Sequence, residues 1–467
     1  MKNQLKKINL HYAALQSLYW LGYATIWASR SVALAEKGCS NTLVGIISAV
    51  SLTSAALVFQ PFMSAIADRS KSFTSRRFAM MLSVLAAIAA LVNWLPGCTL
   101  LCSVIMYVVI GICMIGLAPF LNSMAMALVN KGVPVNYSFG RGIGSAFYAV
   151  GAFSMGFLLE RFGTSLIYLL AMLAFLALAA VTLLFRYVPP QPMADAAVPA
   201  AKEGEVLGNL ALFSRYPMFI MLVLGYTLLM STHSVTCTYT YQIVARVGGT
   251  ASDMGVALAI GAFVELPAMI LFNYLRKRTS LRFLLRLCAF GFLLRNVLLL
   301  FAPNMTVIYI TMTLQFLECG LSIPSTVYYV SEKIDSANQV KGQSLLHAIS
   351  NGIGSAAGSI VAGRLLDISG VSGMLIFTTA CCVVGGIILF IVTSKEWPYR
   401  GRKSHKVRRP CRSGRAFSLQ EEIKREKARS NNCCEKKAIQ LNVYTFHGNG
   451  ARIRPEGLRG NRDGRSQ

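Results

Sequence analysis

The chain has 467 residues, of which 55% are hydrophobic and only 14% are charged, and its mean hydropathy is +0.54. This composition is too apolar for a protein with a water-exposed surface, so it excludes a water-soluble enzyme. With 38 glycines and 15 prolines, the chain does not have the composition of a collagen-like or wholly disordered protein either. The composition therefore predicts a membrane protein.

Apolar stretches recur along most of the chain. A transmembrane helix needs about 20 such residues, and we expect twelve helices, at residues 12–34, 42–66, 78–96, 99–128, 138–160, 164–187, 217–241, 253–274, 283–301, 304–330, 343–366 and 372–394. The longest internal loop, 188–215, is rich in proline and alanine and is interpreted as a cytoplasmic linker between two six-helix halves, 1–187 and 216–394. The sequence thus predicts an all-α membrane protein.

The basic residues of the loops predict its topology. With a cytoplasmic N-terminus, the inner segments hold 18 Lys/Arg and the outer loops hold four, so we expect both termini inside the cell membrane. The first span also resembles a cleavable signal peptide, because three lysines precede an apolar run that ends at residues 33–35. Its length and its polar residues Gln16 and Arg30 favour a retained helix.

An internal repeat links the two halves. TSRRF at 74–78 recurs as TSLRF at 279–283, and GIGSA at 142–146 recurs at 352–356. Pro61 and Pro119 have counterparts at Pro267 and Pro324, at nearly the same offset. Six spans separate each pair, which predicts parallel repeats related by an axis along the membrane normal. Glycines around the GIGSA segments predict close helix packing in preference to direct ligand contact.

A basic loop carries the first resemblance to a known family. The stretch from Ser64 through Asp68 and Arg69 to Arg76 and Arg77 resembles the loop between helices 2 and 3 of the major facilitator superfamily, with serine in place of the usual glycine. The resemblance covers residues 1 to about 394 and implies the twelve-helix fold of that superfamily. It implies a gating or structural role for these charges, although a solvated loop is the alternative for Asp68.

Ionisable side chains within apolar spans are costly and mark functional sites. The expected spans contain seven: Arg30, Arg141, His233, Glu265, Arg295, Glu318 and His347. We expect Arg30 to be structural and to reach the membrane interface near Glu36. Both histidines are interpreted as helix-packing residues, because neither has a carboxylate nearby in the sequence. The other four form a charge-balanced set, as a buried cluster requires.

Those four residues resemble one branch of the superfamily, the oligosaccharide, nucleoside and phenylpropionate:proton symporters that include lactose permease. Arg141, followed by Gly-Ile-Gly-Ser, matches the helix 5 signature of that branch, and Glu265 and Arg295 match its helix 8 carboxylate and helix 9 arginine. In helix 10 Glu318 is kept, whereas Gln315 replaces a histidine. The resemblance implies proton coupling by Glu318 and Arg295.

The same correspondence implies substrate contacts by Arg141, Glu265, Gln315, Tyr148 and Asn122. Tyr148 stands where the branch has a sugar-stacking tryptophan, and Asn122 stands where it has a sugar-binding glutamate. These departures leave the substrate open. Arg141 and Tyr148 are seven residues apart and share a helix face.

A second aromatic group lies in the first span. Tyr19, Tyr23 and Trp27 form a stripe along one helix face, which serves either the substrate or packing.

Several other chemistries have no motif in this sequence. It has no G-x-x-x-x-G-K-[ST] motif for ATP, and no C-x-x-C or His/Cys spacing for zinc or haem. We expect no cofactor and no metal, with the proton as coupling ion. The expected partners are a small solute, protons and the lipid bilayer, with no nucleic acid, and the protein is expected to be a monomer.

The tail 395–467 holds 20 Lys/Arg and 7 Asp/Glu and shows no apolar periodicity, so we expect it to be disordered. Attraction to the anionic inner leaflet and an accidental extension of the chain are equally favoured interpretations.

The sequence as a whole predicts a secondary active transporter, not an enzyme, that takes up a small polar solute such as a sugar with protons. Nucleoside or aromatic-acid transport, and a non-transporting sensor of the same fold, are the alternatives.

Overall fold

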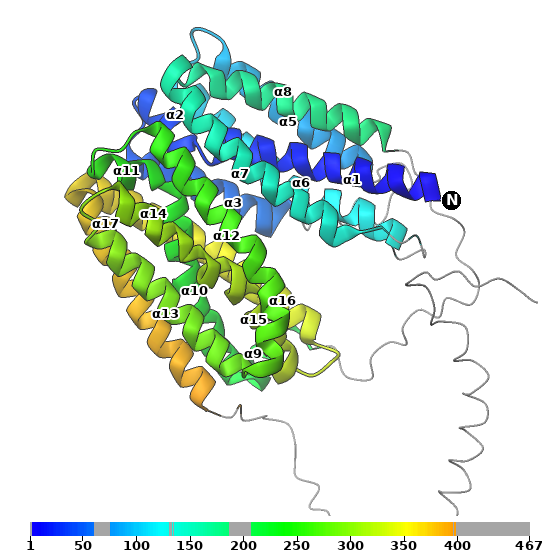
Figure 1. Cartoon of the computed structure of the whole chain (residues 1–467), viewed down its shortest axis with the longest axis vertical. Helices are drawn as coiled ribbons and strands as arrows, with labels where there is room; N and C mark the ends of the chain where they lie inside the picture. Colours follow the sequence, from blue (N-terminus) through cyan, green and yellow to red (C-terminus); the bar gives the residue numbers. More distant parts are fainter. Residues whose placement is uncertain are drawn as a thin grey trace, which may run out of the picture. The chain divides into compact units, whose positions relative to one another are not determined.

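The computed structural model describes residues 2–59, 75–129, 133, 135–185, 207–395 and 397. Within these ranges the chain is helical apart from short turns, and no strand occurs. The first half contains α1 (Lys2–Gly22), the π-helical turn η1 (Tyr23–Trp27), α2 (Arg30–Glu36), α3 (Asn41–Ser54), η2 (Ala55–Phe59), α5 (Ser75–Trp94), α6 (Leu100–Val129), α7 (Tyr137–Phe162) and α8 (Ser165–Leu184) (Figure 1).

The second half begins with α9 (Asn209–Arg215), which occupies the end of the expected linker. It continues with α10 (Pro217–Thr238), α11 (Thr240–Arg246), α12 (Ala251–Arg278), α13 (Leu281–Leu300), α14 (Met305–Thr313), η3 (Phe316–Leu321), α15 (Ser322–Lys333), α16 (Gln339–His347), η4 (Ala348–Gly354) and α17 (Ser355–Ser394). Linker residues 188–206 and nearly all of the tail lie outside the described residues.

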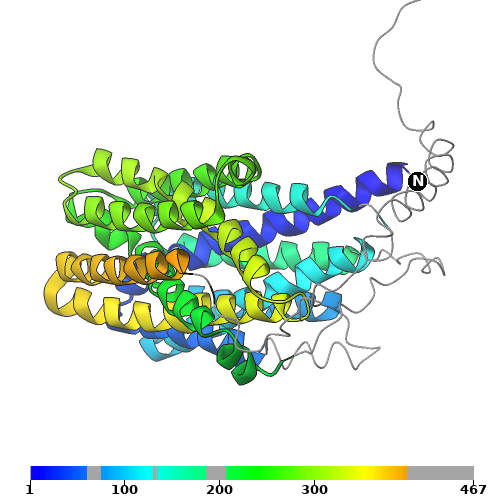
Figure 2. The ribbon, with the colours of Figure 1, turned by 90° about the horizontal axis from the view of Figure 1, so that it is seen from below.

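The described part of each predicted span is helical, and the second and sixth spans are described only as far as Phe59 and Phe185. Ten helices among the described residues are long and apolar enough to cross a membrane. One of them covers residues 339–394, and Gly370 breaks it with φ 67° and ψ −170°, between the last two predicted spans. Figure 2 shows the chain reversing direction within α17, where its yellow and orange parts run side by side.

Glycines build the tight turns at one end of the helices. Five have positive φ, a conformation that other residues adopt only with strain: Gly38, Gly97, Gly163, Gly248 and Gly370. Each lies between an odd-numbered predicted span and the next even-numbered one, so all five turns lie at the same end of the fold. We call this end the short-turn end.

Small residues also set the helix packing, and the repeat is visible in it. A Cβ atom on Gly144 of α7 would lie 2.5 Å from the Trp20 side chain of α1. In the second half, a Cβ atom on Gly354 would lie 2.3 Å from Thr227 of α10. The fifth span therefore packs on the first as the eleventh packs on the seventh. This confirms the packing interpretation of these glycines.

The two halves contact each other at the short-turn end. Among the described residues, all hydrogen bonds between the halves lie there. Arg30 bonds to Thr238, Asn41 bonds to Tyr239, Gln242 and Asp367, Thr42 bonds to Asp367, and Glu160 bonds to Thr250 and Ser252. One apolar core crosses between the halves there and includes Tyr239, Met254 and Leu375. A second core belongs to the second half alone.

Candidate functional site

An ion pair is buried in the second half. Arg295 on α13 and Glu318 in η3 each have a side chain only 1% exposed, and Arg295 Nη1 donates to Glu318 Oε2. The structure therefore brings together the two residues that the sequence assigned to proton coupling. Buried charges at this depth are costly unless they are paired, and ionisable residues inside a membrane span are candidates for a functional site.

The pair is incompletely satisfied within the described chain. Arg295 Nη2 lies 3.0 Å from Met312 Sδ, whereas Arg295 Nε and Glu318 Oε1 have no hydrogen-bond partner. A fully bonded pair would be a rigid structural element. This pair keeps unused hydrogen-bonding capacity at both of its members.

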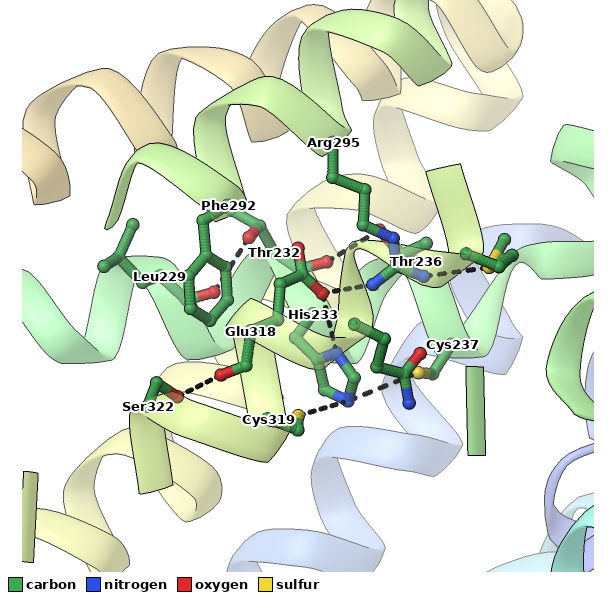
Figure 3. Close-up of polar contacts among 12 residues, drawn as sticks. Leu229, Thr232, His233, Thr236, Cys237, Phe292, Arg295, Glu318, Cys319 and Ser322 are labelled. Carbon is green, nitrogen blue, oxygen red and sulfur yellow. Dashed lines mark hydrogen bonds and ion pairs between the residues drawn. The ribbon is translucent and has the colours of Figure 1, made fainter. Parts of the chain in front are cut away.

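His233 of α10 is the third member of this cluster. Its Nδ1 lies 3.2 Å from Glu318 Oε2, and Figure 3 shows Glu318 between Arg295 and His233. His233 Nε2 lies 3.5 Å from Cys237 Sγ and 3.3 Å from Cys319 Sγ. The interpretation of His233 as a packing residue rested on the lack of a carboxylate nearby in the sequence. It is wrong, because the fold brings Glu318, 85 residues away in the chain, into contact with His233.

Glu265 and Gln315 form a separate pair. Gln315 Nε2 donates to Glu265 Oε1 over 2.7 Å, and both side chains are half-buried. A Cβ atom on Gly261 would lie 2.5 Å from Gln315 Oε1, so a larger residue at that point of α12 would displace the Gln315 amide. Gln315, which replaces the branch histidine, thus contacts Glu265, and the imidazole beside Glu318 comes from α10 instead.

Arg141 lies in the first half without an ion pair among the described residues. It donates to Ser145 Oγ over 3.1 Å, and its guanidinium lies 4.3 Å from the centre of the Trp20 ring. Of the four predicted charges, Arg295 and Glu318 are thus in direct contact, whereas Glu265 is hydrogen-bonded to Gln315 and Arg141 to Ser145.

Tyr148 lies beside the same tryptophan. Its ring centre is 6.0 Å from those of Trp20 and Tyr23, and all three side chains are half-buried. The predicted stripe of Tyr19, Tyr23 and Trp27 divides, because Tyr19 and Trp27 are buried in packing. The sequence reasoning missed Trp20, which the i, i+4 pattern skips. Its partners lie on α7, so no spacing along the first span pointed to it.

Asn122 belongs to a small amide cluster. Its Oδ1 accepts hydrogen bonds from Gln16 Nε2 at 3.1 Å and from the Tyr12 hydroxyl at 3.4 Å. Gln16 is 2% exposed, and its Nε2 also contacts the Tyr12 hydroxyl. Asn122 thus lies in the first half beside an amide and a hydroxyl, and Gln16 and Tyr12 are additional candidates for the substrate contact that the resemblance implies.

Arg30 does not reach the membrane interface as expected. Its side chain is buried, donates to Ser48, to the Trp27 carbonyl and to Thr238, and lies over the Trp27 ring. The expectation fails because neutral oxygens on α10 and α3 hold the guanidinium inside.

Among the remaining predicted residues that the structure describes, none joins the site. His347 is exposed and its Nδ1 contacts Asn351 at 3.0 Å. Arg76 donates to the Leu183 carbonyl at 3.5 Å, Arg77 is exposed at the start of α5, and Asp68 and Arg69 lie outside the described residues. No cluster of metal-binding side chains occurs among the residues that the structure describes.

Comparison with known proteins fits this arrangement of helices. Residues 12–377 match the model of the MFS_1 like family. The chain belongs to this family of the major facilitator superfamily. A maltose permease of Geobacillus stearothermophilus is 27% identical over 339 residues, which cover 72% of this chain and 82% of the permease. The uncharacterized transporter YwbF of Bacillus subtilis (strain 168) is 24% identical and covers 84% of this chain, with 96% of its own length aligned.

Solved structures share the fold. The crystal structure of the nucleoside transporter NupG aligns with a TM-score of 0.68 at 13% identity and covers 83% of this chain and 98% of NupG. An inward-facing bacterial homologue of the human lysosomal transporter Spinster aligns with a TM-score of 0.65 at 14% identity, covering 84% of this chain and 98% of the homologue. This MFS_1 like protein is therefore a multi-pass membrane transporter with the major facilitator fold, and its relatives are transporters, not enzymes.

Proposed function

We propose that this MFS_1 like protein is a proton-coupled symporter that takes up a small polar solute, in the first instance a sugar or oligosaccharide, by alternating access. One observation supports it above the others: Glu318 lies buried between Arg295 and His233 with an unused carboxylate oxygen. A carboxylate in such a position changes its electrostatic surroundings when it binds a proton. The proton is then the coupling ion, and no other cofactor is required.

The two halves supply the proposed alternating access. The short-turn end is closed by hydrogen bonds between the halves, and by the topology rule this end faces outward. Both termini are then cytoplasmic, in the cell membrane. In this orientation the outer end is closed while Arg295 and Glu318 form their ion pair. In the proposed cycle, the protein reaches this state after it has released the proton to the inside, and Glu318 is protonated when substrate binds from outside.

The first half supplies the proposed solute contacts. Arg141 offers a planar donor fork, Trp20 and Tyr148 offer ring faces, and Asn122 offers an amide. Across from them, Glu265 and Gln315 can accept and donate hydrogen bonds. A ring-bearing polyol uses all of these groups, and the maltose permease relative also favours a sugar.

Replacement of Glu318 by glutamine tests proton coupling. Glutamine mimics the protonated carboxyl, so Glu318→Gln should retain substrate binding and exchange of internal for external solute. It should lose accumulation against a gradient, because no proton is carried. Reconstituted vesicles with a pH gradient and radiolabelled solute measure both activities. Glu332→Gln, an exposed residue of α15, is the matched control and should behave like the wild type.

The solute for this assay comes from a thermal-shift screen of sugars, nucleosides and aromatic acids. If a nucleoside or an aromatic acid stabilises the protein and a sugar does not, the sugar proposal is wrong while the symport proposal stands. Ligand binding without transport in vesicles would favour the sensor. A Glu318→Gln protein that still concentrates solute together with protons would contradict the assignment of Glu318.

A further inference from the structure

Helix α10 connects the buried ion pair to the contact between the halves. His233 faces Glu318 from the last third of this helix. Thr238 and Tyr239, five and six residues further on, lie where α10 ends and the contact with the first half begins. The hydrogen bonds at the two places are therefore separated by little more than one helical turn.

At the short-turn end, Thr238 holds an unusual cation. Thr238 Oγ1 accepts from Arg30 Nη2, and Arg30 also donates to Ser48 Oγ at 2.9 Å and to the Trp27 carbonyl at 2.6 Å. Arg30 is 5% exposed and forms no ion pair with a described residue. A buried cation with neutral acceptors alone is costly. Its burial therefore depends on Thr238 remaining in place.

Tyr239 lies at the crossing of α3 and α17. Its hydroxyl donates to the carbonyls of Asn41 at 2.9 Å and Ser359 at 3.1 Å. Cβ atoms on Gly45 and Gly363 would lie 2.9 Å and 2.5 Å from this hydroxyl, so only glycine leaves room for it at both positions. A small shift at the end of α10 therefore disturbs two contacts between the halves at once, Arg30 with Thr238 and Asn41 with Tyr239.

We propose that His233 is a positioning residue through which Glu318 controls closure of the outer end, with α10 as the connecting element. The inference rests on the proposed proton coupling and adds the route by which it acts. While Glu318 is ionised, its bond to His233 holds α10 in place, and Thr238 and Tyr239 close the outer end. When Glu318 is protonated, the bond weakens, α10 shifts, and Arg30 regains access to water.

Several other ionisable groups surround the imidazole and would respond with it. They are Cys237 on α10 itself, Glu318 and Cys319 on η3, Arg295 on α13, Glu265 on α12, Tyr23 on η1 and Tyr148 on α7. Among these groups, only Glu318 both contacts His233 and pairs with a cation, which is why the proposal assigns the control to it.

Hydrogen–deuterium exchange of the full-length protein in detergent tests the route without a substrate. In the wild type, backbone protection of residues 36–45 and 238–250, corrected for the intrinsic pH effect, should be higher at pH 8 than at pH 5. His233→Leu should lower protection at pH 8 to the acidic level. His233→Asn, whose amide nitrogen can replace Nδ1, should restore most of the difference. His347→Leu is the control and should match the wild type.

A second variant separates the two ends of α10. Thr238→Val removes the acceptor of Arg30, so protection of residues 36–45 should be low at every pH. In transport assays, His233→Leu should move the pH midpoint of uphill uptake to higher pH by about one unit, because a hydrogen bond to the carboxylate is lost. Unchanged pH-dependent protection in His233→Leu would overturn the inference. If backbone protection depends on pH but the protein transports no solute, the symport proposal is wrong, whereas the inference about α10 stands.

Discussion

At the scale of single residues, Arg141 and Arg295 show how the same side chain can serve two purposes. Arg295 is enclosed with a carboxylate, whereas Arg141 lies half-buried on the Trp20 ring with Ser145 as hydrogen-bond partner. The guanidinium of Arg141 therefore has donors left for a ligand. This difference in partners is why the proposed function assigns coupling to Arg295 and solute binding to Arg141.

Substitution of Arg141 by lysine should weaken solute binding by at least about tenfold, since lysine keeps the charge but loses the planar fork and the stacking on Trp20. Isothermal titration with the solute identified by the thermal-shift screen measures the effect. Arg161→Lys, at the exposed end of the same helix, should bind normally. Near-wild-type affinity of Arg141→Lys would show that Arg141 is a packing residue.

At the scale of helices, α7 and α12 approach so closely that only glycine fits at the crossing. A Cβ atom on Gly255 would lie 2.6 Å from the Ala152 carbonyl oxygen and 2.8 Å from Gly156 Cα. These neighbours are backbone atoms, which cannot rotate away. The crossing lies beside the contact between Glu160 and Ser252, so it belongs to the closed short-turn end.

Gly255→Ala should separate α7 from α12 and weaken closure at the short-turn end, at a cost of about 1–3 kcal/mol for overpacking. Hydrogen exchange of residues 156–162 and 248–256 should rise accordingly. The matched control is Gly142→Ala on α7, where a Cβ atom meets nothing within 4 Å. Equal exchange in the two variants would contradict the role of this crossing.

The turn between α15 and α16 depends on a carboxylate outside the spans. Burial alone would raise the pKa of Asp335, but hydrogen bonds from the Tyr216 hydroxyl at 2.7 Å and from Asn338 lower this pKa below its ordinary value of 3.8. The ionised carboxylate therefore stabilises the fold at neutral pH. This contribution is lost as the pH falls through the lowered pKa.

Tyr216→Phe should lower the melting temperature at pH 6, because the carboxylate loses a hydrogen bond. The difference from the wild type should shrink as the pH falls below about 4 and Asp335 is protonated. Thermal unfolding in detergent across this range measures it. Tyr274→Phe, whose exposed ring lies on α12, is the control without an effect. A difference that stays constant with pH would show that the hydroxyl acts independently of the carboxylate.

At the scale of the whole molecule, the distribution of loop charges predicts how the protein sits in the membrane. A reporter inserted at Arg278 should be cytoplasmic, and one at Gly248, in a glycine turn of the short-turn end, should be external. Protease protection in sealed cells and inverted vesicles distinguishes the two sides. A Gly248 reporter that is accessible only from inside would reverse the topology, and with it the direction assigned to the closed end.

The sequence by itself determined the helices and the family. Apolar length and the repeat are local or periodic properties, and the bilayer leaves a chain of this hydrophobicity few alternatives to a helical bundle. The candidate charges could be found in the same way, because any ionisable residue stands out in an apolar span. The resemblance in helices 5, 8, 9 and 10 then indicated which of them to examine.

Only the tertiary structure decided which of these charges contact one another. His233 and Glu318 are 85 residues apart, and Arg30 and Thr238 are 208 apart, so no spacing along the chain predicts either contact. Trp20 was missed for the same reason, since its partners Arg141 and Tyr148 lie on another helix. Periodicity fixes the face of a helix, whereas the packing of helices against each other determines what that face contacts.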